Sequence, residues 1–168
     1  MKNESGFTLV ELLITIVVAS ILLAFAVPAF NSFVQNNRIA SQSNELISAM
    51  AIARSEAIKR KVSITVCNSS DSATCSGGWN QGWLAFIDTD NDGTVDTGET
   101  ILRVWGGFSG GSTITTVPAG VSTVLFDRLG GANNTVVFQL RIPNCRGDKA
   151  RNITLRTTGS IETTTAAC

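Results

Sequence analysis

Five carboxylates and a glycine lie between residues 88 and 99 at spacings that suit calcium binding. The stretch reads Asp-Thr-Asp-Asn-Asp-Gly-Thr-Val-Asp-Thr-Gly-Glu, and it fits the calcium-loop pattern D-x-[DN]-x-[DN]-G-x5-E at every fixed position. Carboxylate and backbone carbonyl oxygens are the ligands that Ca²⁺ prefers, and the glycine permits a sharp turn between them. The predicted ligands are the side chains of Asp88, Asp90, Asp92, Asp96 and Glu99 and the carbonyl of Thr94.

The flanks of this acidic loop (residues 88–99) limit what the pattern can mean. Residues 83–87 and 101–105 read as strands, whereas the loop of an EF-hand lies between two helices. Calcium would therefore act as structural reinforcement of a hairpin, and we expect no cofactor to be required. The alternative is an acidic turn without metal, because Asp, Asn and Gly favour turns by themselves.

Basic side chains gather in the C-terminal part of the chain. Arg141 is followed by Arg146, Lys149, Arg151 and Arg156, with Asp148 as the acid among them. Strand alternation would put several of them on one face, where they could meet phosphates. Such a run is more often a solvated face, and few aromatic residues lie close by to stack on bases. DNA is therefore an alternative partner, through the last four of these side chains.

The composition excludes several kinds of catalysis. The chain has 168 residues, no histidine, no tyrosine and a net charge of zero. Histidine triads, histidine general bases and histidine-ligated zinc are thereby excluded. The glycine-rich stretch 106–111 lacks the spacings of phosphate-binding loops. Because no nucleophile has a matched base, we expect no enzymatic activity.

A long apolar segment near the N-terminus contains one charged residue. Between Phe7 and Phe30 that residue is Glu11. A helix needs about 20 apolar residues to cross a bilayer, so residues 7–30 are predicted to span a membrane. A carboxylate in such a helix costs about 2.5–3.5 kcal/mol on insertion scales. Glu11 should therefore have a cationic partner, and residues 7–30 contain none.

Residues 6–11, Gly-Phe-Thr-Leu-Val-Glu, resemble the processing site of type IV prepilins and pseudopilins. In that family a prepilin peptidase cuts after the glycine on the cytoplasmic side, and the new N-terminal phenylalanine is methylated. The resemblance implies cleavage between Gly6 and Phe7. It also supplies the partner of Glu11, the α-amine of Phe7 on the same or a neighbouring subunit, so Glu11 would guide assembly. Lys2 supports a cytoplasmic N-terminus.

Behind the apolar segment the helix should continue. Neither Gly nor Pro interrupts residues 31–61, and apolar side chains recur there at spacings of three and four, which indicates an amphipathic helix. We expect one apolar stripe formed by Leu46, Ile47, Met50, Ala51, Ala53, Ala57 and Ile58. Pro28 removes one backbone hydrogen bond and should kink or loosen the helix.

From residue 62 onward the pattern is typical of antiparallel strands, with alternating apolar residues and frequent Thr and Val. Strands are predicted at 62–67, 83–87, 101–105, 113–117, 123–126, 135–142, 152–156 and 160–164. The predicted fold class is α+β, a long helix packed on an antiparallel β-sheet domain. The predicted parts are a leader (1–6), a transmembrane segment (7–30), an amphipathic continuation of the helix (31–61) and a β-rich globular domain (62–168).

The order of these elements resembles the GspH/FimT branch of pilin-like proteins. Trp83 and Phe86 precede the acidic loop, and a Leu-Arg strand follows it. The branch includes minor pilins of type IV pili and minor pseudopilins of type II secretion, which are low-copy components near a filament tip. One subgroup binds DNA during natural transformation through a GRxR-like motif that is not present here as such.

This resemblance implies a structural subunit that helps to initiate or cap assembly of a type IV pilus. Its partners would be other major and minor pilins, the prepilin peptidase and N-methyltransferase, and the inner membrane, which it would cross once with a periplasmic C-terminal domain. The alternatives are a minor pseudopilin of type II secretion and a DNA-binding minor pilin.

Four cysteines complete the set of reactive side chains. An even number in a domain outside the cytoplasm indicates disulfides, and three pairings are possible. We predict Cys67–Cys75, which closes a short polar loop, and Cys145–Cys168, which ties the last residue to a loop between two predicted strands. The other two pairings require Cys67 or Cys75 to reach the C-terminal strands. A compact domain permits this, so these pairings remain alternatives.

Overall fold

A computed structural model of the chain describes residues 8–145 and 147–168. The predictions made for Gly6, Phe7 and Arg146 lie outside these residues. The chain divides into two compact units, Met1–Asn37 and Arg38–Cys168. Helix α1 (Leu9–Arg60) contributes to both units.

The described part of the first unit is the N-terminal portion of α1, whose apolar side chains are exposed. Every Leu, Ile, Val and Phe from Leu9 to Phe33 exposes at least 50% of its surface. The hydroxyls of Thr15 and Ser20 donate to the carbonyls of Leu12 and Val17 at 2.7 Å, so they are satisfied within the helix. The helix is continuous through Pro28 and contains a stretch long and apolar enough to cross a membrane.

The second unit adds strands to the C-terminal portion of α1. They are β1 (Ile64–Asn68), β2 (Gly82–Ile87), β3 (Ile101–Gly106), β4 (Thr113–Val117), β5 (Thr123–Phe126), β6 (Val136–Arg141), β7 (Ala150–Leu155) and β8 (Ile161–Ala166). Within the described residues they form two antiparallel sheets, in the orders β3-β2-β1-β5 and β4-β6-β7-β8. The predicted fold class is confirmed. The division into two sheets was not foreseen from the sequence.

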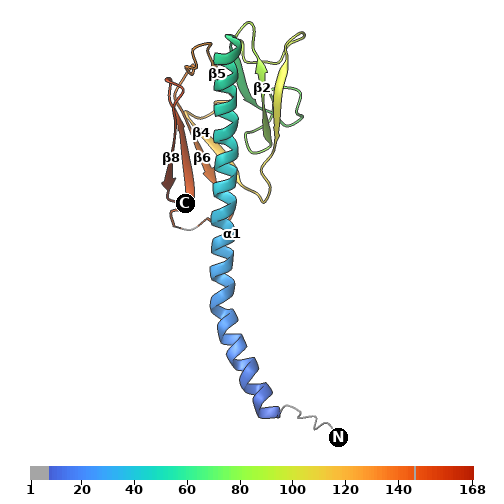
Figure 1. The fold of residues 1–168 in the computed structure, drawn as a ribbon, viewed down its shortest axis with the longest axis vertical. Helices are drawn as coiled ribbons and strands as arrows, with labels where there is room; N and C mark the ends of the chain where they lie inside the picture. The colour runs from blue at the N-terminus through green and yellow to red at the C-terminus, as the bar shows by residue number, and fades with distance from the viewer. Residues whose placement is uncertain (1–7, 146) are drawn as a thin grey trace. The chain divides into compact units, whose positions relative to one another are not determined.

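The core of this unit lies where α1 meets both sheets. Leu46 and Met50 of α1 belong to one buried cluster with Val66 of the first sheet and Phe138 of the second. Figure 1 shows β2 on one side of the green part of α1 and β6 and β8 on the other. One face of the helix therefore holds the two sheets together.

The buried stripe of α1 is narrower than the sequence suggested. Met50 and Ala57 are buried, but Ala51 and Ile58, which we expected on the same stripe, are exposed. Successive helical residues are rotated by about 100° around the axis, since a turn takes 3.6 residues. Positions 51 and 58 therefore lie at the edge of the covered face, beside Gly159 and Ile161, and remain exposed.

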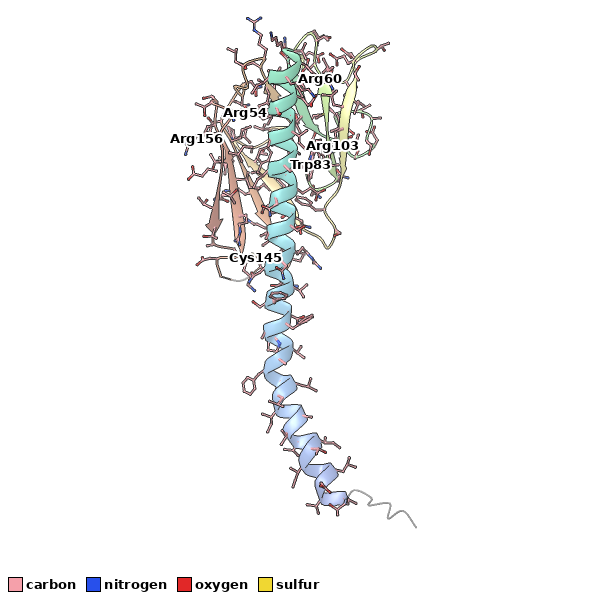
Figure 2. The ribbon with its side chains drawn as sticks, viewed as in Figure 1. Arg54, Arg60, Trp83, Arg103, Cys145 and Arg156 are labelled. Atoms are coloured by element: carbon pink, nitrogen blue, oxygen red, sulfur yellow. A yellow bond between two sulfur atoms is a disulfide. The ribbon has the colours of Figure 1, made fainter. Side chains whose placement is uncertain are left out.

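Arg54 joins α1 to two turns of the second unit. Its Nε donates to the carbonyl of Gly130 at 2.9 Å, and its Nη2 donates to the carbonyl of Thr158 at 3.2 Å. The turns approach each other so closely that a Cβ at Gly159 would collide with the Gly130 carbonyl oxygen. In Figure 2, Arg54 leaves α1 on the side of the sheet that carries Arg156.

The disulfides are Cys67–Cys75 and Cys145–Cys168, each with a Cα–Cα distance of 5.5 Å, and they are the predicted pairs. The second holds the end of β8, a mostly exposed edge strand. Two further contacts fix the same end. Arg141 donates to the carbonyls of Ala167 and Cys168 at 2.9 and 3.0 Å, and the Cys168 amide donates to the Gly147 carbonyl at 3.0 Å.

We predict that replacing Cys145 and Cys168 by serine lowers the free energy of unfolding by about 3 kcal/mol, the chain-entropy value for a loop of this length. The C-terminal edge strand should also exchange its amide hydrogens faster, because a free terminus frays. Denaturant unfolding and hydrogen exchange of the full chain in detergent measure the two effects. Unchanged stability in the double variant would contradict the prediction.

For Arg54→Ala we expect a loss of about 1.5–3 kcal/mol of unfolding free energy, because the substitution removes charge-assisted hydrogen bonds to two turns. Arg60→Ala is the matched control. Arg60 pairs with the neighbouring Glu56 at the surface of the same helix, and exposed pairs of this kind contribute less than about 1 kcal/mol. Equal losses in the two variants would refute the role given to Arg54.

Candidate functional site

The acidic loop connects β2 to β3, and its first carboxylate is buried. Asp88 is 1% exposed. Its Oδ2 accepts hydrogen bonds from Thr65 Oγ1 at 2.7 Å and from the Gly93 amide at 3.1 Å. Its Oδ1 is also buried but has no hydrogen-bond partner among the described residues. Thr65 lies on β1, so this contact was not visible in the loop sequence.

The five carboxylates of the loop gather in two groups that share Asp90. One group combines Asp90 with Asp88 and Glu99, and the other combines it with Asp92 and Asp96; within each group the ligand oxygens lie within 4.8 Å of one another. The structure thus brings together all five side chains that the calcium pattern selects.

Backbone and hydroxyl donors hold some of these carboxylates in place. Glu99 accepts from the Thr89 amide at 2.7 Å and from the Asp96 amide at 3.2 Å. Asp92 accepts from the Thr94 amide at 2.7 Å and from its hydroxyl at 2.8 Å. The acidic side chains therefore hold the loop in its shape.

Negative charge is concentrated in the loop. Asp92 above all, together with partial burial and the carboxylates of Asp90, Glu99 and Asp88, raises the pKa of Asp96. In contrast, the backbone amide and the hydroxyl of Thr94 lower the pKa of Asp92. Among residues 8–145 and 147–168, none of the five carboxylates forms an ion pair with a lysine or arginine.

A small apolar cluster anchors the loop to the sheet. Cys67, Leu84 and Phe86 are its buried members, and Val95 of the loop packs against them. Cys75, the disulfide partner of Cys67, packs on the same cluster. The acidic loop is therefore coupled to the first disulfide, although the two are far apart in the sequence.

Glu11 lies in the first turn of α1 and contacts Thr8. The Glu11 amide donates to Thr8 Oγ1 at 3.2 Å, and Glu11 Oε2 accepts from the amide and hydroxyl of Thr8, both at 3.5 Å. This reciprocal pattern is a capping box. The motif Thr-x-x-Glu could have revealed it in the sequence. Because the 3.5 Å contacts are long, they hold the carboxylate weakly.

The described basic residues of the C-terminal part do not all lie on one face. Arg151 pairs with Leu140 across the sheet and shares its face, whereas Arg141, the next residue, points to the other face because side chains alternate along a strand. Arg156 forms an ion pair with Glu162 at 2.9 Å, and Lys149 is partly buried. Figure 2 shows another arginine, Arg103, on the other sheet.

Comparison with known families identifies both parts of the chain. The family model described as type II transport protein GspH matches residues 42–159. The model of the prokaryotic N-terminal methylation motif matches residues 1–27. The second match includes the predicted processing site and Glu11.

Two crystal structures of the type IV minor pilin FimU of Pseudomonas aeruginosa, strain PAO1, have a similar fold. The first is 22% identical with a TM-score of 0.62 and covers 77% of this chain and 90% of its own. The second, in another space group, is 21% identical with a TM-score of 0.58 and covers 74% and 91%. None of the curated proteins compared with the sequence matches it.

These matches agree with the fold. The GspH model spans most of the chain, including most of the buried part of α1, the first sheet and β4, β6 and β7 of the second. The methylation motif covers most of the exposed apolar part of α1. The function of such a chain is structural and non-enzymatic. The chain belongs to the GspH family of pilin-like proteins.

Proposed function

We propose that the chain is a minor pilin, a subunit anchored in the inner membrane that helps to initiate or cap a type IV pilus. The observation that carries this proposal is the apolar surface of α1 from Leu9 to Phe33, which no other part of the described chain covers. A surface of this size requires a cover. Lipid provides it before assembly, and the helices of other pilins provide it in the filament.

Glu11 would make the contact between this apolar surface and a neighbouring subunit specific. A carboxylate in an apolar environment needs a charge partner, and Thr8 offers only neutral contacts at 3.5 Å. The α-amine of a processed Phe7, on the same or a neighbouring subunit, has the opposite charge. Pairing of the two would favour an incoming subunit in one register and disfavour all others.

Processing and location follow from the same segment. Cleavage between Gly6 and Phe7 would remove the leader that carries Lys2 and create the amine. Lys2 supports a cytoplasmic leader, which puts the second unit in the periplasm. The two disulfides of that unit suit an oxidising compartment. The expected partners are the prepilin peptidase and other major and minor pilins.

A minor pseudopilin of type II secretion is the second candidate, and it is favoured by the description of the matching family as a type II transport protein. The fold likeness to a type IV minor pilin favours the pilus. Deleting the gene and counting surface pili while measuring secreted enzymes separates the two. We expect a loss of pili that the wild-type gene restores. Normal piliation with failed secretion would contradict the pilus assignment.

We predict that Glu11→Gln and Glu11→Ala are both inserted and cleaved but enter filaments at least tenfold less than the wild type. Glutamine can replace glutamate in a capping box, so Glu11→Gln keeps the helix cap and removes the charge, whereas Glu11→Ala removes both. Immunoblots of sheared filaments and membranes measure the distribution. Normal incorporation of Glu11→Gln with poor incorporation of Glu11→Ala would assign Glu11 to capping alone.

The processing site makes a separate prediction. Mass spectrometry of the mature protein should find a methylated Phe7 at its N-terminus. Gly6→Ala should be partly cleaved, whereas Gly6→Leu should leave the full leader in place, because a bulky side chain obstructs the peptidase. A wild-type mature chain that begins beyond residue 30 would refute the assignment.

A further inference from the structure

We propose that the acidic loop binds one calcium ion, with Asp88, Asp90 and Glu99 as its central ligands, and that this ion fixes the connection between β2 and β3. Asp92 and Asp96 would complete the oxygen shell together with the carbonyl of Thr94. The proposal is independent of whether the chain serves a pilus or a secretion system.

The spacing of the carboxylate oxygens suits a single ion. Calcium binds oxygen at about 2.3–2.6 Å, so two oxygens on the same ion are at most about 5 Å apart. The oxygens of Asp88, Asp90 and Glu99 lie within 4.8 Å of one another. Those of Asp90, Asp92 and Asp96 meet the same limit. Because Asp90 belongs to both groups, a small rearrangement of the exposed side chains would bring all five around one ion.

Asp88 provides an independent indication of a ligand. Its side chain is 1% exposed, and its Oδ1 is buried without a hydrogen-bond partner in the part of the chain that the structure describes. A buried carboxylate oxygen without a partner is costly. Thr65 and the Gly93 amide hold the other oxygen, Oδ2, so the carboxylate cannot turn to water without losing them. A cation at Oδ1 would remove this cost.

An ordinary acidic turn explains less of the geometry. Turn formation requires Asp and Asn side chains that bond to nearby amides, and Asp92 does this with Thr94. It does not require a buried carboxylate at the start of the loop or oxygens from both ends of the loop within 4.8 Å. Calcium accounts for both features, because it neutralises charge and draws on ligands from both ends.

The loop is placed so that an ion would stabilise more than the loop itself. Val95 packs on the cluster of Cys67, Leu84 and Phe86. Trp83 and Trp105 are paired across β2 and β3, the two strands that the loop connects. Binding should therefore stabilise this pair of strands, and the fluorescence of the two tryptophans should report the effect.

The test uses the full-length protein in detergent, first treated with EDTA. Calorimetric titration with CaCl₂ should give binding heat near one ion per chain, and the thermal midpoint followed by tryptophan fluorescence should rise by several degrees. MgCl₂ at the same concentration should give a much smaller rise, because Mg²⁺ requires shorter bonds and stricter octahedral geometry. A similar rise with both metals would indicate general charge screening and overturn the proposal.

Variants locate the ion. Asp90→Asn and Glu99→Gln should each lower the calcium affinity at least tenfold and reduce the rise in thermal midpoint. Asp148→Asn is the matched control, because it removes the same charge from an exposed loop elsewhere and should leave the affinity unchanged. Asp90 is exposed, so its variant should fold. The absence of binding heat at millimolar calcium, or equal affinity in Asp90→Asn and wild type, would refute the site.

Discussion

The contact of one helix face with two separate sheets is the constraint on which the second unit depends. The strands of one sheet hydrogen-bond to one another and not to those of the other sheet, so cohesion between the sheets comes from side chains. Ala49, Ala53 and Ala57 are buried on this face next to Leu46 and Met50. Small residues let the helix approach closely, while the two larger side chains fill the space between the sheets.

Features at the ends of the elements reinforce this packing. Trp79 donates from Nε1 to the Val121 carbonyl at 2.7 Å and meets Phe138 of the second sheet edge-on, with ring centroids 5.0 Å apart. Arg54 joins the helix to the turns that contain Gly130 and Thr158. The edge strand β8 is mostly exposed and adds little to the core. The Cys145–Cys168 disulfide, just beyond its end, holds this strand in place instead. Contacts of the helix, of the loops and of the C-terminal end thus all contribute to closing the globular unit.

Two carboxylate sites in this chain have no cationic partner among the described residues. For both, a compensating positive charge would have to come from outside the described chain. Glu11 lies in an apolar segment, and Thr8 is its hydrogen-bond partner in the helix cap. Asp88 begins a loop with four more acids. The free energy of an unpaired charge rises as its surroundings become less polar. For Glu11 the compensating charge would come from a subunit, and for Asp88 from an ion.

Local patterns in the sequence determined the elements of this protein. The periods of 3.6 and 2 residues located α1 and all eight strands to within about two residues, because side-chain direction repeats along a single element. The short separation of Cys67 and Cys75 and the terminal position of Cys168 likewise sufficed to predict the disulfide pairs. The fixed spacing of its carboxylates identified the acidic loop. The capping box of Thr8 and Glu11 is equally local, since its Thr-x-x-Glu spacing is present in the sequence.

Only the tertiary structure decided how these elements meet. The division into two sheets depends on pairings such as β1 with β5, which are remote in sequence. Ile58 is exposed because the sheets cover only part of the apolar helix surface. Arg141 and Arg151 point to opposite faces because the strand register, and not the charge of the run, sets their direction. The burial of Asp88 depends on Thr65 of a neighbouring strand, and no local pattern contains that contact.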